Sequence, residues 1–243
     1  MPDRTVERLA SYADHISYDQ LSPDVVHQIK RLVLDSLGCG IGAFNAKPTV
    51  AAREVASLST SAKPATLLGT RTKSTPELAA FANGTMVRYL DFNDSYNGAD
   101  IAHPSDNIPV ALAAGEAHGA TGKQLITAIA LTYEVQAAWA DTHQLQSNGV
   151  WDQAAYGSIA APLGAGKIMA LTRNQLAEAL RISVVSSMTL GEARRGTISH
   201  WKAAAVPNAG RNGVFAAMLA KRGMTGPPEI FSGSHGFFEG VSM

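Results

Sequence analysis

The feature that most constrains this fold is a helix-start signal that recurs along the chain. A Ser or Thr that can cap a helix is followed by a Pro and an acid, or by a Gln three residues later, and both patterns are typical of a helix N-terminus. Apolar residues follow each signal at helical spacing. Four segments carry the signal: Ser22-Pro23-Asp24, Thr75-Pro76-Glu77, Thr121 with Gln124, and Thr172 with Gln175. We therefore expect a series of helices.

Strand signals are weak by comparison. Only residues 65–69 read as a short extended piece, and no longer stretch alternates between apolar and polar residues. Apolar residues make up 46% of the chain but aromatic residues only 7%, so a core must be built from Ala, Leu, Val and Ile, which suit closely packed helices. We predict an all-α fold with a large multi-helix domain covering residues 1–243.

Charge and cysteine content exclude several classes of function. Lys and Arg together number 20, as do Asp and Glu, so no excess of positive charge predicts nucleic acid or an acidic membrane as a partner. Cys39 is the only cysteine, which excludes an internal disulfide and an iron–sulfur cluster held by several cysteines of this chain. Residues 1–8 do not resemble a secretory signal, and no apolar run reaches the ~18 residues of a membrane span, so we expect a cytoplasmic protein.

Two long irregular stretches, residues 91–107 and 191–208, interrupt the helical pattern. We call them the first and second polar loops. The first carries Asp91, Asp94, Ser95, Asp100, His103 and Asp106, with Arg88 just before it. Carboxylates, a hydroxyl and an imidazole can transfer protons. Two other interpretations stay open: a solvated loop whose Asp and Ser residues cap the next helix, and a metal site formed by Asp91, Asp94 and His103, although no paired His spacing supports it.

The second polar loop is a basic cluster in an otherwise neutral chain. It contains Arg194, Arg195, His200 and Lys202. Such cations can bind the carboxylates of a substrate, Arg in a bidentate manner and Lys as a point charge or proton donor. The alternative is an exposed run of surface charge. Trp201, next to Lys202, favours a partly buried site because tryptophan is rarely fully exposed.

Several segments together resemble the MmgE/PrpD family, in order and over essentially the whole chain. The matching segments are Leu32-Val-Leu-Asp-Ser-Leu-Gly38, Phe81-Ala-Asn-Gly84, Leu90-Asp-Phe-Asn-Asp-Ser95, His103-Pro-Ser105, Ser199-His-Trp-Lys202, Pro207-Asn-Ala-Gly-Arg-Asn212 and Thr225-Gly-Pro-Pro228. The last three are most similar to the 2-methylcitrate dehydratase branch. The family also includes cis-aconitate decarboxylase and iminodisuccinate epimerase.

The resemblance implies a large all-α domain with a smaller α+β lid domain, a homodimer, and catalysis without a metal or organic cofactor. Asp91, Ser95, His103 and Lys202 match positions that line the family's active site, with Asp94 adjoining them. Together with the basic loop, this predicts a catalytic set of Asp91, His103 and Lys202, and a substrate-binding set of Asp94, Ser95, Arg194, Arg195 and His200.

The chain departs from the family pattern in two places. The segment Gly149-Val-Trp-Asp-Gln153 lacks a histidine that the family commonly places there, and the chain ends at Met243, where family members continue into the lid domain. We therefore expect a protein truncated before most of the lid.

The predicted function is a cofactor-independent hydro-lyase that dehydrates a small di- or tricarboxylate such as 2-methylcitrate. The same chemistry could serve a decarboxylase or an epimerase of a related acid. From a different class, the chain could be a non-catalytic helical subunit that binds a separate lid-domain chain.

Overall fold

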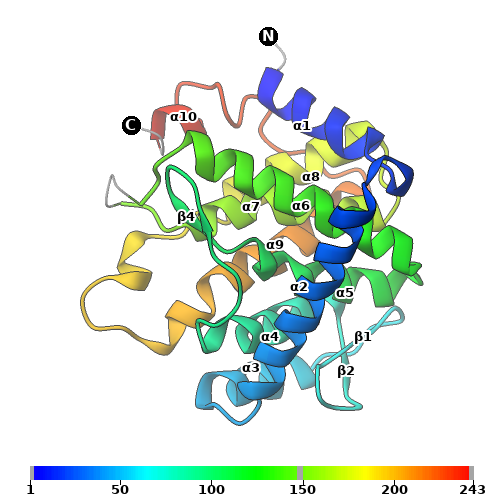
Figure 1. Cartoon of the computed structure of the whole chain (residues 1–243). Coiled ribbons are helices and arrows are strands. Elements are labelled where there is room, and N and C mark those ends of the chain that lie inside the picture. Colours follow the sequence, from blue (N-terminus) through cyan, green and yellow to red (C-terminus); the bar gives the residue numbers. More distant parts are fainter. Residues whose placement is uncertain (1–2, 147–149, 241–243) are drawn as a thin grey trace.

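Helices dominate the computed structural model, which describes residues 3–146 and 150–240 (Figure 1). The α-helices are α1 (Arg4–His15), α2 (Pro23–Gly42), α3 (Lys47–Ser57), α4 (Pro76–Tyr89), α5 (Ile108–His118), α6 (Gly122–Thr142), α7 (Ala154–Ile168), α8 (Arg173–Ser186), α9 (Ala205–Ala220) and α10 (Phe237–Gly240). Within the described residues, strands form only two-residue antiparallel pairs: β1 (Ala65–Thr66) with β2 (Lys73–Ser74), and β3 (Tyr96–Asn97) with β4 (Ile101–Ala102). The all-α prediction is confirmed.

The helix-start signals mark real N-termini. Ser22 accepts a hydrogen bond from the backbone N–H of Val25 at the start of α2. Thr121 and Thr172 both form the expected capping boxes, which satisfy N–H groups that a helix leaves unpaired in its first turn. Helix α4 begins at Pro76 as predicted, although the Thr75 side chain makes no capping hydrogen bond.

The core is built from alanines and glycines where helices approach closely. Helix α7 is buried along nearly its whole length and packs against α6, α8 and α9. A Cβ atom at Gly213 of α9 would lie 2.6 Å from Ala161 Cβ and 2.9 Å from Pro162 N of α7, so only glycine fits there. A Cβ at Gly164 would collide with Thr132 of α6, so this glycine also marks a point of close helix contact.

The two polar loops contain short ordered elements. The first holds the β3–β4 pair and a 3₁₀ turn, η2 (Pro104–Asn107), and the second holds η3 (Gly191–Arg194) and η4 (His200–Ala203). The second loop ends earlier than the predicted residue 208, because α9 starts at Ala205. Pro207 lies in the first turn of α9, where the N–H that proline lacks would have no partner within the helix.

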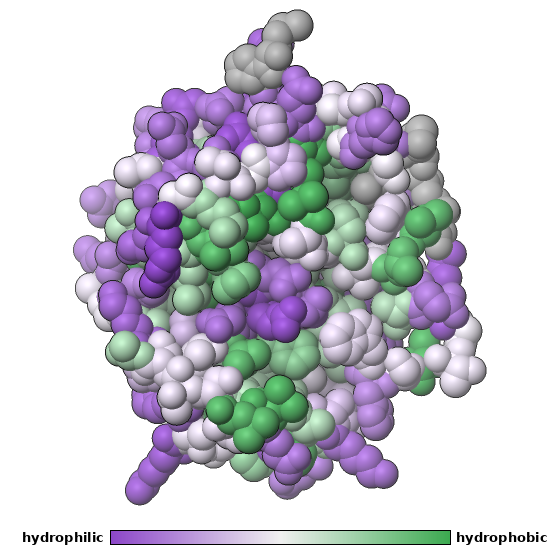
Figure 2. Space-filling model, turned by 180° about the vertical axis from the view of Figure 1, so that it is seen from behind, coloured by the Kyte–Doolittle hydropathy of each residue, from purple (hydrophilic) through white to green (hydrophobic). Residues whose placement is uncertain are grey.

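Several large apolar side chains remain exposed. Leu34, Leu58 and Phe92 are 72%, 84% and 77% exposed, and Figure 2 shows hydrophobic patches among hydrophilic side chains on one face. Cys39 is buried. No helix within residues 3–146 or 150–240 combines the length and apolar character that crossing a membrane requires.

Candidate active site

Arg88, in the last turn of α4, is the centre of a polar network below the first polar loop. Its side chain is only 3% exposed. Nη1 donates to the carboxylate of Asp91 and lies 3.4 Å from Asn93 Oδ1, and Nη2 lies 3.1 Å from His103 Nε2. Nε is 3.6 Å from Asp106 Oδ2, close enough for an ion pair. One guanidinium therefore contacts four side chains of the loop.

His103 is held as a neutral imidazole. Its Nδ1 lies 2.6 Å from the backbone carbonyl oxygen of Asp94, which can only accept, so Nδ1 carries the proton. Nε2 is then an acceptor, and the nearby Arg88 guanidinium donates to it. Burial, and next the positive charge of Arg88, lower the pKa of His103 below its usual value. His103 is accordingly a potential proton acceptor at neutral pH.

The carboxylate of Asp94 fixes the loop. Oδ1 accepts from the backbone N–H of Ser105 at 3.1 Å and from the Ser105 hydroxyl, and Oδ2 accepts from the Tyr133 hydroxyl at 2.6 Å. Burial and then the Asp94 charge raise the pKa of Tyr133, which keeps this hydroxyl protonated as a donor. Asp94, predicted to bind substrate, thus has both carboxylate oxygens engaged by protein groups.

Asp106 is a buried acid beside Arg88. Oδ1 accepts from Asn93 Nδ2 at 3.1 Å, and Asn93 Nδ2 also donates to Ser105 Oγ at 2.9 Å. Burial raises the pKa of Asp106 to about 7, against the opposing effect of the Arg88 charge. The carboxyl group therefore exchanges its proton near neutral pH.

This pKa predicts a pH-dependent stability. Because Asp106 holds its proton in the folded state up to about pH 7 but loses it in the unfolded state near its usual value of 3.8, the free energy of unfolding should fall as pH rises between these values. Urea unfolding of the wild type and of Asp106→Asn from pH 4 to pH 8 measures the effect. The wild type should lose stability relative to the variant up to about pH 7 and stay level above it. A pH-independent difference would contradict a protonated Asp106.

Asp91 and Lys202 join the two polar loops. Lys202 Nζ, in η4, lies 2.6 Å from Asp91 Oδ2, while Arg88 binds the other oxygen. Burial raises the pKa of Asp91, but the hydrogen bond from Lys202 and the charge of Arg88 outweigh it, so the pKa lies below its usual value. Asp91 therefore stays ionised and pairs with Arg88 of α4 and Lys202 of the second polar loop.

These groups open onto a cavity of about 290 Å³ between α4 and η4. The lining residues are Arg88, Tyr89, Asp91, Ile198, Ser199, His200, Lys202 and Ala203. Of the predicted site residues, the cavity thus brings together Asp91, His200 and Lys202, and His103 is linked to it through Arg88.

Three other predicted residues are directed elsewhere. Arg194 Nε lies 2.5 Å from Oδ2 of Asp152, an acid that is 1% exposed and needs a cation to offset its burial. Arg195 Nη2 donates to the backbone oxygen of Gln146 at 2.8 Å. Ser95 is exposed just before β3. None of the three is among the residues that line the cavity.

Asp100 also binds other side chains of the protein. Its carboxylate accepts from the Tyr156 hydroxyl at 2.9 Å and from Gln146 Nε2 at 2.8 Å, which connects the β3–β4 pair to α7 and to the segment that follows α6. Gly149, in the segment that lacks the expected histidine, lies outside the described residues. The next part of that segment supplies Asp152, the partner of Arg194.

Sequence reasoning missed Arg88 as the centre of the network, and with it Asn93, Ser105, Tyr133 and Asp152. Arg88 had one available signal, a cation in the last turn of a helix directly before an acidic loop. The proposed metal ligands Asp91, Asp94 and His103 each bind protein groups separately. Within residues 3–146 and 150–240, no cluster of three or more His, Cys, Asp or Glu side chains is arranged to hold a metal.

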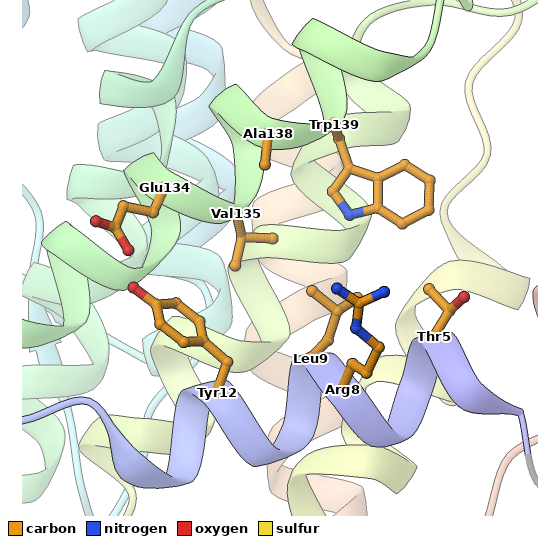
Figure 3. A pocket seen from close by; sticks show the side chains of 8 residues that line it. All are labelled: Thr5, Arg8, Leu9, Tyr12, Glu134, Val135, Ala138 and Trp139. Carbon is orange, nitrogen blue, oxygen red and sulfur yellow. The ribbon is translucent and has the colours of Figure 1, made fainter.

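A different cavity, of about 420 Å³, lies between α1 and α6 (Figure 3). Its walls are mostly apolar, with Arg8 and Glu134 exposed at its edges. Its lining comprises Thr5, Arg8, Leu9, Tyr12, Glu134, Val135, Ala138 and Trp139. It shares none of these residues with the Arg88 network, so we place the candidate active site at the α4–η4 cavity.

The all-α domain thus brings together a carboxylate (Asp91), an imidazole (His200) and two cations (Arg88 and Lys202) at one cavity, side chains of the types that can transfer protons and pair with an anion. The chain belongs to the MmgE/PrpD family, because the family's N-terminal domain model matches residues 7–243.

The curated relatives include several 2-methylcitrate dehydratases. The 2-methylcitrate dehydratase of Salmonella typhimurium is 28% identical over 98% of this chain and 51% of its own length, and that of Escherichia coli K12 is 27% identical over 92% and 49%. A probable 2-methylcitrate dehydratase of Saccharomyces cerevisiae is 28% identical over 98% and 49%. The chain therefore spans about half the length of the curated relatives it matches.

Proposed function

We propose that this chain carries the acid–base residues of a cofactor-independent hydro-lyase that dehydrates a small polycarboxylate of the 2-methylcitrate type. The observation that carries the proposal is the convergence of Asp91, Lys202 and Arg88 at one cavity, with His103 directly behind Arg88. The relatives are named 2-methylcitrate dehydratases, which supports the same reaction class.

Dehydration of a 3-hydroxy acid needs two proton transfers and a charge to stabilise them. One group removes a proton from the carbon next to a carboxylate, and another protonates the departing hydroxyl group. His103 and Asp91 are the candidate base and acid, in either order. Lys202 would stabilise the negative charge that develops on the substrate carboxylate as the proton leaves. The sequence predicts Arg194 or Arg195 as a second cation for this role. At the cavity itself, the second cation is Arg88.

A thermal-shift screen over di- and tricarboxylates tests whether the cavity binds such acids. A ligand at about 100 times its Kd adds about 2.7 kcal/mol of stability, which for a chain of this size corresponds to a rise in Tm of about 5–10 °C. We expect this rise with citrate or 2-methylcitrate, a smaller one with a monocarboxylate such as acetate, and its loss in Lys202→Met. If neither tricarboxylate raises Tm at millimolar concentration, the proposed ligand class is wrong.

Two alternatives predict different results with the same protein. A decarboxylase or epimerase would bind the acids but release carbon dioxide or change the configuration of the substrate without forming an unsaturated product. A subunit that needs a separate lid would show no turnover alone and would gain it when mixed with the C-terminal half of a relative. The chain spans about half the length of the curated relatives, so the C-terminal half of one of them is the polypeptide to add.

A further inference from the structure

Two cations at the α4–η4 cavity share a single carboxylate. One carboxylate oxygen of Asp91 accepts a hydrogen bond from Arg88 Nη1, and the other accepts one from Lys202 Nζ. The Arg88 side chain is 3% exposed, whereas those of Asp91 and Lys202 are 44% and 35% exposed. Arg88 therefore forms the buried wall of the site, and Asp91 and Lys202 lie toward solvent.

This arrangement is one that a ligand carboxylate could adopt. A carboxylate binds two cations well when each oxygen accepts from a separate donor, because both charge-assisted hydrogen bonds form without strain. Arg194 and Arg195 are directed to Asp152 and to the Gln146 carbonyl. Of the described residues that line the cavity, two are Arg or Lys, namely Arg88 and Lys202.

The backbone of Asp91 adopts an uncommon conformation. Its φ is +56°, in the left-handed region, directly after Leu90 at the end of α4. Glycine is the usual residue at such a helix end, and Asp and Asn tolerate the conformation better than other residues when their side chains are hydrogen-bonded. The contacts of the Asp91 side chain with Arg88 and Lys202 supply such bonds and stabilise this conformation.

We propose that Arg88 and Lys202 form the receptor for one carboxylate of a di- or tricarboxylate ligand, and that Asp91 occupies this receptor in the empty site. The proposal rests on the proposed function for its ligand class and extends it to a specific subsite. A binding ligand displaces Asp91 from the cations, and the freed side chain is then next to the ligand rather than bound to the protein.

Displacement also changes the chemistry of Asp91. In the empty site the hydrogen bond from Lys202 and the Arg88 charge hold its pKa below the usual range, against the effect of burial. Once both cations bind the ligand, burial acts with less opposition and the pKa of Asp91 rises. The carboxylate becomes a stronger base only when a ligand is present, which suits a group that must accept a proton from that ligand.

The test is citrate binding by Asp91→Asn, measured by isothermal titration calorimetry. Asn tolerates the left-handed conformation and keeps the shape of the side chain but removes the competing charge. Each partly exposed ion pair is worth up to about fivefold in an equilibrium constant, so the Kd for citrate should fall by about five- to thirtyfold.

Glu116→Gln is the matched control. Glu116 is a partly exposed acid paired with Lys73 on another part of the surface, and its substitution changes the net charge by the same amount. Its Kd for citrate should equal that of the wild type. In the double variant Asp91→Asn with Lys202→Met, the gain in affinity should disappear because one of the two receptor cations is missing.

The possible outcomes distinguish a failure of the carboxylate receptor from a failure of the proposed dehydration reaction. Tighter citrate binding by Asp91→Asn supports the receptor even if no acid is dehydrated, and in that case only the proposed function fails. Unchanged or weaker binding overturns the receptor even if the wild type is an active dehydratase. If neither protein binds citrate, the Arg88–Lys202 pair is no carboxylate receptor, and an equal gain in Glu116→Gln would attribute the effect to net charge alone.

Discussion

His103→Ala and Lys202→Ala are each expected to lower kcat/KM for dehydration of 2-methylcitrate by about 10²- to 10⁴-fold, the usual contribution of a positioned acid, base or charge-stabilising group. The substitution of His103 removes an imidazole whose Nε2 is a proton acceptor. That of Lys202 removes the cation that binds Asp91 at the cavity. Formation of the conjugated double bond, followed by ultraviolet absorbance, measures both, with the chain alone and with an added lid polypeptide.

Matched controls separate catalysis from general damage. His118 is a half-buried histidine whose Nδ1 lies 3.0 Å from the Ala114 carbonyl oxygen, and Lys73 is a surface lysine paired with Glu116. Alanine at either position should leave kcat/KM within about twofold of the wild type, because surface and structural substitutions away from the site act mainly on stability. Wild-type rates in both His103→Ala and Lys202→Ala would remove these residues from the mechanism.

The pH profile distinguishes the two possible roles of His103. Burial and the Arg88 charge lower the pKa of His103 below 6.5. If His103 is the base, it must be neutral, so the rate should stay high on lowering the pH to 6.5 and fall only as the pH passes through this lowered pKa. If His103 is the acid, it must be protonated, and the rate should instead rise as the pH is lowered from 6.5 through this lowered pKa.

The helices could be predicted from sequence because their signals are local. A capping residue and the Gln three positions later contact each other within one turn, so Thr121 and Thr172 are recognisable without knowledge of the fold. The first polar loop was recognisable for a similar reason, since its polar residues crowd into a short segment between apolar helices.

The pairing of side chains across the site could not be predicted, because it depends on residues far apart in the chain. Asp91 and Lys202 are separated by 111 positions. Arg194 has the same sequence signature as a substrate-binding arginine, but a buried carboxylate at Asp152 binds it. Sequence composition indicates that cations are present in the second loop, whereas only the packing of η4 against α4 and α9 decides which cation reaches the cavity.

Arg88→Met is expected to lower the free energy of unfolding by about 3–5 kcal/mol, the usual cost of removing one partner from a buried charged network. Methionine fills similar volume but leaves Asp91, Asn93, His103 and Asp106 without the guanidinium they contact. Urea unfolding at pH 7 measures the loss. Lys73→Met is the control: it removes a cation from an exposed pair with Glu116, and such pairs contribute about 0–1 kcal/mol.

The dependence on pH and on Asp106 shows why Arg88→Met loses stability. Arg88 lowers the pKa of Asp106 against the effect of burial, so the pKa in Arg88→Met should lie further above its usual value. The variant should therefore be more destabilised at pH 8 than at pH 5, because at pH 8 folding must bury an uncompensated carboxylate or protonate it. Adding Asp106→Asn should recover about 1–3 kcal/mol at pH 8 and less at pH 5. If the loss is the same at both pH values and Asp106→Asn recovers nothing, then Arg88 stabilises the fold through the packing of its side chain rather than through its charge.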